Sequence, residues 1–339
     1  MKKPNSYTNI LKVLEVLNNH TDEANGLMAT EIKKIINSEA GEEQISKTET
    51  ITNILDRLME TDFFGCTINE INGPGRRRYY LERALTLAEA IVLINLVQNA
   101  GSISRRHSED MILVIKNILS ARQRKILNDR VIFKGKDFKT PNVSTLLNVE
   151  LITEAFINEE KITFIYLKYN NKKELTERGA TRIVIPYAIV PQQGRYYLLA
   201  KKDHEEVVRV FRIDKMTDIN LTGIKLTTEE TQEVARYNAA EHVSRSVFMY
   251  IGTKPEIITL KCTYQQGIHS AVVETFPNAV IEDTADGGFI AKFRAEPSGI
   301  VYWALQYCVA CEVLSPSHVR DEVRQCLQEA YQRYTGVLP

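Results

Sequence analysis

The spacing of hydrophobic residues changes close to Lys161 in this 339-residue chain. In the long segment just before that point apolar residues recur every three or four positions, which is the spacing of one face of a helix. After it they alternate in runs such as KITFIYLKYN, TRIVIPYAIV, GRYYLLA and VVRVFRID, which turn residues separate. This change predicts an α+β chain, and its length predicts two or three domains.

The first 84 residues have the pattern of three short helices and a hairpin. The first helix is expected over Ser6–Asn18, and the second has Thr30 as its N-cap and ends near Gly41. The third begins with a capping box formed by Ser46 and Glu49. Two strand-like runs around the turn sequence NGPG follow. Three helices closed by a hairpin are the pattern of a winged helix-turn-helix.

The middle of the chain is predicted to be helical and to join or dimerise the parts around it. Thr86 opens a capping box, Met111–Leu127 is a long amphipathic stretch, and Ser144–Phe156 is a third helix. Between the last two, GKDFKTPN is predicted to be a loop.

After a polar segment, the last unit starts near Pro255. Its hydrophobic patterns predict a strand, a helix, two strands joined by a Gly-Gly hairpin, a helix, a strand and a final helix. The order strand-helix-strand-strand-helix-strand is that of a ferredoxin-like unit.

Composition and motifs favour a cytoplasmic binding protein. The 43 basic and 43 acidic residues balance, so a site for nucleic acid must be a local basic patch. The chain lacks an apolar run long enough for a membrane span, its N-terminal segment is too polar for a signal peptide, and its 5 cysteines do not form a disulfide framework.

Catalytic signatures are missing from the sequence. We find no phosphate-binding glycine loop, GxSxG or HExxH motif, so we expect no enzyme activity, no metal and no cofactor. Cys308 and Cys311 form a lone CxxC, without the further ligands of a zinc site or the helix N-terminus that favours a redox centre. They are interpreted as small core residues.

Residues 160–224 resemble the WYL domain of bacterial transcription regulators. The letters YYL at 196–198 stand at the Trp-Tyr-Leu positions that name the domain, and FRIDKM at 211–216 resembles its strand F-R-(L/I)-D-R-(I/M). The run GIVYWALQYCVACEVLSPSHVRDEVRQCLQEAYQRY resembles the extension that follows the domain. The chain departs from the pattern at Tyr196, in place of tryptophan, and at Lys215, in place of an arginine that could bind an anion bidentately.

The resemblance implies a DNA-binding regulator that works as a homodimer. Its WYL domain would be a small antiparallel barrel of SH3 or Sm type that senses a nucleotide or single-stranded nucleic acid. The expected segments are 1–84, a winged helix-turn-helix; 85–158, a helical linker or dimerisation region; 159–225, the WYL sensing domain; 226–254, a linker; and 255–339, the C-terminal extension.

The third helix and the hairpin are the expected contacts to double-stranded DNA. The outward face of such a helix can enter the major groove, and arginines together at a hairpin tip suit phosphate or the minor groove. The candidate DNA-binding residues are Lys47, Thr48, Thr52, Asn53, Arg57, Arg76, Arg77 and Arg78. Residues 1–84 hold 11 basic and 13 acidic residues, a net of −2, so an ordinary solvated surface is the alternative.

Strand parity gives a second candidate site. An even-length loop near residue 203 pairs odd positions of GRYYLLA with even positions of VVRVFRID. One face then holds Arg195, Tyr197 and Arg212, two guanidinium groups beside a phenol that can bind phosphate and stack a base. The opposite face is the better core.

Neighbouring strands extend this site in the prediction. The candidate effector-binding residues are Tyr166, Arg182, Arg195, Tyr197, Arg209 and Arg212, with Arg209 on the predicted core face. The alternative is that the arginines pair at the surface with Glu205, Glu206 or Asp214, where ion pairs contribute little.

The leading prediction is a ligand-responsive transcription regulator whose winged helix binds an operator. Two alternatives stay open: a nucleic-acid-processing accessory factor that holds substrate at both basic sites, and an adaptor whose winged helix binds proteins. Sequence-specific, salt-sensitive binding of duplex DNA would distinguish the regulator from the adaptor.

Overall fold

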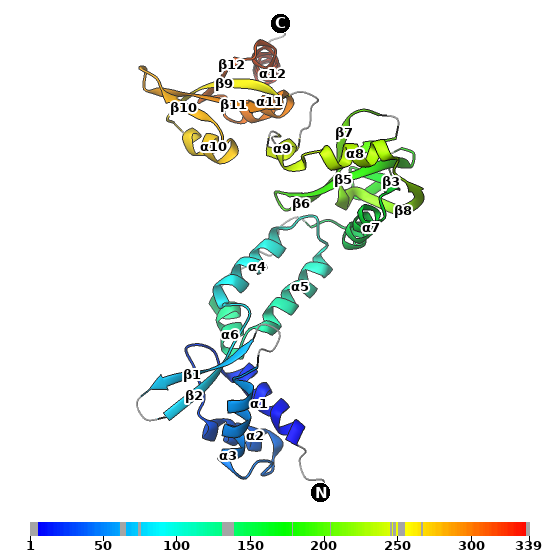
Figure 1. Ribbon diagram of the computed structural model, residues 1–339. Helices are drawn as coiled ribbons and strands as arrows, with labels where there is room; N and C mark the ends of the chain where they lie inside the picture. Colours follow the sequence, from blue (N-terminus) through cyan, green and yellow to red (C-terminus); the bar gives the residue numbers. More distant parts are fainter. Residues whose placement is uncertain are drawn as a thin grey trace. The chain divides into compact units, whose positions relative to one another are not determined.

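The protein is a mixed α/β chain whose described strands pair antiparallel in three sheets (Figure 1). The structure is a computed structural model that describes residues 6–61, 66–73, 76–130, 139–177, 179–203, 205–244, 246, 249, 255–265 and 267–336. The chain divides into two units, residues 1–143 and 144–339. In the described residues, none of the helices is both long and apolar enough to cross a bilayer.

In the first unit, three helices and a hairpin share one hydrophobic core, and three helices follow (Figure 1). The elements are α1 (Ser6–His20), α2 (Ala29–Ala40), α3 (Thr48–Leu58), β1 (Thr67–Gly73), β2 (Arg76–Glu82), α4 (Leu87–Asn99), α5 (Arg105–Ile118) and α6 (Ala121–Arg130). The core takes Val13 from α1, Ile32 from α2, Ile51 from α3 and Tyr79 from β2. Burial of one apolar face of each helix therefore assembles this region.

Two helix starts differ from the predicted caps. The N-cap of α2 is Met28, and Thr30 lies within the helix. The Met28 amide donates a hydrogen bond to the Glu31 carboxylate at 2.8 Å, so the first turn is closed without a threonine cap. The N-cap of α3 is Lys47, not Ser46, and no side chain caps it.

Other helix ends agree with the sequence. Gly41 ends α2 in the left-handed conformation, with φ of 68°, which glycine adopts without strain. Thr86 and Glu89 form the predicted capping box at α4: the threonine hydroxyl oxygen accepts from the Glu89 amide at 3.2 Å, and the Thr86 amide donates to the carboxylate at 2.8 Å.

The predicted single helix over Met111–Leu127 is wrong, because the helical conformation is interrupted between α5 and α6. Leu119 takes an extended conformation and is fully buried. Ser120 then starts α6, since its hydroxyl oxygen accepts from the Gln123 amide at 3.1 Å. A buried side chain and a new cap thus outweigh the continuous amphipathic pattern. Part of the predicted loop GKDFKTPN lies outside the described residues.

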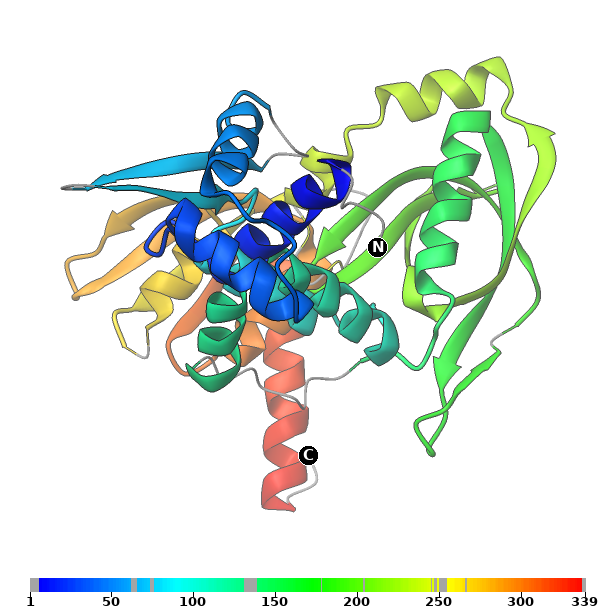
Figure 2. The same ribbon diagram turned by 90° about the horizontal axis from the view of Figure 1, so that it is seen from below.

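The second unit begins with a helix against a curled sheet, and α7 lies along this sheet in Figure 2. The elements are α7 (Thr145–Asn158), β3 (Glu160–Tyr169), β4 (Leu175–Glu177), β5 (Arg182–Gln192), β6 (Arg195–Lys202), β7 (Val208–Arg212), a 3-10 turn η1 (Ile213–Lys215) and β8 (Met216–Lys225). The strands run in the order β4-β3-β5-β6-β7, and β8 pairs with β3. Ile152 and Ala155 of α7 pack with Phe164 and Phe211 of the sheet, so this helix belongs to the core of the sheet.

The segment predicted as a linker, 226–254, contains two helices, α8 (Thr228–Arg236) and α9 (Ala239–Ser244). Thr227 caps α8 by accepting from the Glu230 amide at 3.2 Å. The Glu230 carboxylate also pairs with Lys161 of β3 at 2.9 Å, so α8 is attached to the sheet. The prediction overlooked the capping box in the sequence LTTEE.

The C-terminal part is a four-stranded sheet with three helices. The elements are β9 (Glu256–Thr263), α10 (Ile268–Thr275), β10 (Val280–Asp283), β11 (Gly288–Ala295), α11 (Pro297–Gln306), β12 (Cys311–Ser315) and α12 (Ser317–Thr335). The strands lie in the order β10-β11-β9-β12, which puts β12 at an edge. Trp303 and Phe289 are buried in its core, at 2% and 0% exposure.

Candidate nucleic-acid interfaces

The outer face of α3 carries two side chains suited to base edges. Ile51 and Leu55 are fully buried on the inner face, so the helix is fixed in rotation. Asn53 and Arg57 are exposed and four residues apart, which places them on the same face. An amide and a guanidinium in this arrangement match the hydrogen-bonding edges of adenine and guanine.

The start of α3 holds the other predicted helix contacts. Lys47 is exposed at the N-cap, where its backbone leaves the helix. Thr48 and Thr52 are half-buried, and the Thr52 hydroxyl donates to the Thr48 carbonyl at 3.4 Å. Lys47 can therefore reach a phosphate, while Thr52 offers mainly its remaining acceptor capacity and its methyl group.

Arg77 and Arg78 of the hairpin have different partners and do not lie together as predicted. Successive side chains in a strand alternate between its faces, so Arg77 and Arg78 point in opposite directions along β2. Arg77 pairs with Asp56 of α3 at 3.8 Å and with Glu70 of β1 at 3.5 Å. Arg78 donates to the Gly26 carbonyl at 2.9 Å. Arg77 therefore links the hairpin to the outer face of α3, whereas Arg78 anchors the hairpin's other side.

Tyr79, the residue after these arginines, packs in the hydrophobic core and pairs the hairpin with Leu27. Tyr79 is 2% exposed, and its backbone exchanges two hydrogen bonds with Leu27, at 2.8 and 2.9 Å. Its side chain also hydrogen-bonds Arg77 and, together with the charge of Glu70, raises the pKa of that guanidinium. Arg76 is the first residue of β2, but its side chain lies outside the described part of the structure.

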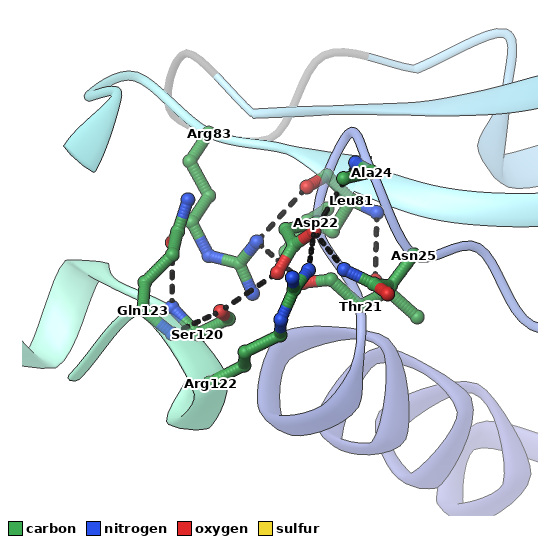
Figure 3. A network of polar contacts seen from close by, with 9 residues as sticks. All are labelled: Thr21, Asp22, Ala24, Asn25, Leu81, Arg83, Ser120, Arg122 and Gln123. Carbon is green, nitrogen blue, oxygen red and sulfur yellow. Dashed lines mark hydrogen bonds and ion pairs between the residues drawn. The ribbon is translucent and has the colours of Figure 1, made fainter. Parts of the chain in front are cut away.

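A polar junction joins the turn after α1 to the start of α6 (Figure 3). The Asp22 side chain is 8% exposed. Its carboxylate accepts from the Ala24 amide at 3.1 Å and from the Asn25 side chain at 2.6 Å. It also accepts from the Ser120 hydroxyl and from Arg122, each at 3.4 Å. One buried carboxylate thus holds together segments about a hundred residues apart. A buried charge of this kind is stable only when it has partners.

Arg83 completes the junction from the end of the hairpin (Figure 3). It donates to the carbonyl of Asn18, to that of Thr21 at 2.8 Å and to that of Leu81 at 3.1 Å. Two of these carbonyls lie at the C-terminal end of α1, where a cation is favourable. Burial lowers the pKa of Arg83. The hairpin, α1 and α6 are therefore held in one arrangement.

This arrangement adds a basic segment that the sequence reasoning missed. Residues 85–143 contain 10 basic and 5 acidic residues, a net of +5 against −2 for residues 1–84. Much of the charge is in α6, whose sequence ARQRKILNDR starts at the junction. The cluster of arginines and lysines in this short helix was the available signal.

The second site is an arginine pair held on a buried carboxylate. Tyr197 of β6 lies directly opposite Arg212 of β7, as strand parity predicted. Arg212 donates to Asp214 through Nε at 3.1 Å and through Nη2 at 2.7 Å, in a bidentate fork. Arg195 Nη1 lies 3.7 Å from the same carboxylate, which is 0% exposed. The fork fixes the plane of the Arg212 guanidinium before any ligand arrives.

The electrostatics of this cluster favour a bound anion. Burial and the charge of Arg212 lower the pKa of Arg195. Burial by itself would also lower the pKa of Arg212. The hydrogen bonds and the charge of Asp214 outweigh burial, so the pKa of Arg212 is raised. Burial also raises the pKa of Tyr197, which keeps the phenol neutral. Two guanidinium groups against one carboxylate leave a net positive charge that an anion would stabilise.

Asp214 is buried, which corrects the alternative that placed it at the surface. It lies in η1, the 3-10 turn that follows β7. The register pairs Tyr197 with Arg212, and its extension by two residues along each strand would put Asp214 opposite Arg195. Parity alone could therefore have located the carboxylate beside both arginines.

Tyr166 and Arg182 reach the cluster from the core side, not from the predicted shared face. Arg182 lies opposite Phe164 in the register, and that ring is fully buried. The Arg182 guanidinium carbon lies 5.1 Å from the ring centroid of Tyr166 and 5.5 Å from that of Phe211. The Tyr166 hydroxyl oxygen accepts from the Arg212 amide at 3.3 Å. Tyr166 contacts the arginine pair only through the Arg212 amide at the end of β7, and Arg182 lies over the Tyr166 ring.

Arg209 and Lys215 have separate partners. Arg209 is half exposed and donates through Nε to Glu205 at 2.5 Å, near the start of β7. It is therefore not part of the arginine pair on Asp214. Lys215, which departs from the family pattern, lies 5.5 Å from the ring centroid of Tyr169. The sequence reasoning missed Tyr169, whose charge interaction with Arg195 places it beside the site.

Comparisons with known proteins identify this part of the chain. Residues 148–221 match the model of the WYL domain, and residues 255–331 match that of the WCX domain. These two segments are therefore similar to a WYL domain and to a WCX domain. All the candidate effector-binding residues fall inside the WYL match, and the match begins within α7, the helix that packs on the sheet.

Two solved structures are similar along most of this chain. One is Proteasome accessory factor B/C (PafBC) of Arthrobacter aurescens, with 17% identity, a TM-score of 0.28 and coverage of 98% of this chain and 48% of that chain. The other is a CRISPR Cas-related protein, with 13% identity, a TM-score of 0.39 and coverage of 98% and 87%. This chain thus spans about half the length of PafBC. A search of the curated proteins finds no match.

Proposed function

We propose that this protein is a DNA-binding transcription regulator whose WYL domain binds a nucleotide or a single-stranded nucleic acid and thereby changes its binding to duplex DNA. In this proposal residues 6–84 form a winged helix-turn-helix, the protein acts as a homodimer, and the WCX domain is ferredoxin-like. The WYL and WCX matches support the regulatory class.

The observation that carries the effector proposal is the arginine pair on Asp214. Arg212 is held in a bidentate fork, Arg195 lies beside it, and Tyr197 offers a ring next to both. The fork to Asp214 uses Nε and one hydrogen of Nη2, so the Arg212 donors left for a phosphate are those of its Nη1–Nη2 edge, held in a fixed plane. The Tyr197 ring is a surface on which a base can stack. A nucleotide unit supplies both groups, so it fits this site better than a simple inorganic anion does.

The DNA proposal rests on α3, the hairpin and α6. Asn53 and Arg57 share the exposed face of α3. Arg77 of the hairpin lies beside that face through Asp56. The junction at Asp22 adds the basic helix α6 to the same unit. Base-reading side chains flanked by cations for phosphate are the arrangement that duplex binding requires.

The decisive experiment measures operator affinity with and without effector. Operator sites would first be mapped by footprinting the DNA upstream of the gene that encodes the protein, and the probes would be nucleoside monophosphates and short single-stranded oligonucleotides. An effector can shift the equilibrium only through its own differential affinity, so Arg212→Ala should abolish the change in operator affinity that the probe causes in the unaltered protein.

Arg209→Ala is the matched control, because Arg209 lies on the same strand but pairs with Glu205. It should respond to the probe as the unaltered protein does. Arg212→Lys tests the fork separately, since it keeps the charge and loses the bidentate geometry. An undiminished response in Arg212→Ala would rule out the effector assignment, and equal affinity for unrelated duplexes would rule out operator recognition.

A further inference from the structure

Two buried cysteines lie directly opposite each other in the WCX domain. Cys262 of β9 is the register partner of Cys311 of β12, and the two strands are neighbours in the sheet (Figure 1). Cys262 is 1% exposed and Cys311 is 9% exposed. Cys308, the other half of the CxxC, is exposed. The structure therefore pairs Cys311 across the sheet, with a residue far away in the sequence.

The hydrogen bonds of the ladder show which kind of pair this is. The Thr263 amide donates to the Ala310 carbonyl at 2.9 Å, whereas the Cys311 amide donates to Tyr307, also at 2.9 Å. Hydrogen-bonded and non-hydrogen-bonded pairs alternate along antiparallel strands, so Cys262 and Cys311 occupy a non-hydrogen-bonded position. Cα atoms at such a position are about 4.5 Å apart, at the short end of the range of about 4.4–6.8 Å that a disulfide spans.

The two thiols differ in acidity. A hydrogen bond from the Cys311 thiol lowers the pKa of Cys262. The same hydrogen bond, together with burial, raises the pKa of Cys311. The thiolate is the reactive form of cysteine, so Cys262 is the nucleophile of the pair and Cys311 is positioned to follow it.

We propose that Cys262 and Cys311 are a redox pair that a hydroperoxide converts to a cross-strand disulfide. The Cys262 thiolate attacks one peroxide oxygen, the O–O bond breaks, and the released alkoxide or hydroxide takes a proton. The Cys311 sulfur then attacks the resulting sulfenic acid, the S–O bond breaks, and hydroxide leaves as water with the thiol proton. Two thiols and one hydroperoxide thus give one disulfide, one alcohol or water, and one water.

The place of the pair in the sheet gives the oxidant access and gives the bond a consequence. β12 is an edge strand, and its register shifts between Val313 and Ser315. Short edge strands open locally more readily than central ones, which admits a small peroxide. The disulfide would then tie β12, and α12 directly after it, to a central strand.

Peptide mapping of the full chain tests the pairing. The reduced protein is treated with hydrogen peroxide, free thiols are alkylated after denaturation, and the digest is analysed by mass spectrometry. We expect a linked peptide that joins Cys262 to Cys311 and disappears with dithiothreitol. Cys308→Ser should form it in equal yield, because Cys308 takes no part. Alkylation of both buried thiols, a sulfinic acid at either one, or a bond to Cys308 would overturn the proposal.

A stability measurement checks the consequence independently. Trp303 is the only tryptophan and is buried in the same core, so its fluorescence follows the unfolding of the WCX domain. Peroxide should raise the thermal midpoint by roughly 5 °C or more in the unaltered protein and in Cys308→Ser. The midpoint of Cys311→Ser should not change with peroxide. An equal rise in Cys311→Ser, or no rise in the unaltered protein, would contradict the proposal.

Discussion

The arginine–carboxylate pairs of the hairpin and of the WYL sheet differ in their exposure to water. In the hairpin, Arg77 pairs with Asp56, and their side chains are 62% and 50% exposed. In the WYL sheet, Arg212 pairs with Asp214, and their side chains are 24% and 0% exposed. Both are arginine–carboxylate pairs, but only the second is removed from water.

The difference shows how burial decides what an ion pair can do. An exposed pair contributes about 0–1 kcal/mol and exchanges easily, so Arg77 can leave Asp56 for a phosphate. A buried carboxylate cannot stay unpaired, so Asp214 keeps both arginines in place. The hairpin arginine is thus available to a long polyanion in many orientations, whereas the sheet arginines form a fixed site for a single group.

Removal of the buried carboxylate should have the largest effect. Asp214→Ala leaves two cations close together without their partner, and breaking a buried pair costs about 3–5 kcal/mol. We expect a large fall in the midpoint of unfolding by urea or heat, which far-ultraviolet circular dichroism measures. Glu205→Ala, which removes the exposed partner of Arg209, should change the unfolding midpoint little. A similar loss in both variants would mean that burial does not distinguish the pairs.

Arg212→Lys should bind the effector about tenfold more weakly than the unaltered protein, since a lysine keeps the charge but offers no planar pair of donors. Arg212→Lys would be compared with the unaltered protein by titrating the probe that gives the response, with isothermal calorimetry as the readout. Equal affinities would show that charge alone holds the ligand.

The hairpin arginine should act on DNA through charge. Arg77→Ala should weaken duplex binding about equally for operator and unrelated sequences and lower the salt slope by about 1. Fluorescence anisotropy at several salt concentrations measures both. Arg57→Ala is the contrasting variant, because loss of a base contact relaxes sequence preference instead. A selective loss of operator binding in Arg77→Ala would assign it to base recognition.

The smallest effect is expected at the exposed carboxylate. Asp56→Ala should change the free energy of unfolding by less than about 0.5 kcal/mol and should tighten duplex binding slightly, since it removes a negative charge beside Arg77. Equilibrium denaturation and the same anisotropy assay would test it. Weaker duplex binding would show that Asp56 positions the arginine.

The sequence was sufficient where the local pattern decides. Alternation placed Tyr197 and Arg212 on one face of the sheet, and the capping box at Thr86 and the glycine end at Gly41 were both predictable. Each of these depends on neighbouring residues or on a short hairpin. The resemblance to the WYL family also rested on such short runs.

Tertiary contacts decided the rest. Asp214 is buried in the 3-10 turn η1, whereas the predicted strand VVRVFRID continued through this residue. The break between α5 and α6 has a local cap, Ser120 with Gln123, which the sequence reasoning missed. The junction at Asp22 depends on residues that are distant in sequence, such as Ser120. No local pattern announces a partner 98 positions away.

The junction at Asp22 sets where this chain can be cut. A fragment ending at residue 84 would lose Ser120 and Arg122, and the carboxylate would keep only its two local donors. It would also carry a net charge of −2, whereas residues 1–143, with 21 basic and 18 acidic residues, carry +3. The shorter fragment would therefore attract DNA less than the longer one. Work on the proposed DNA-binding part should use a fragment that continues through α6.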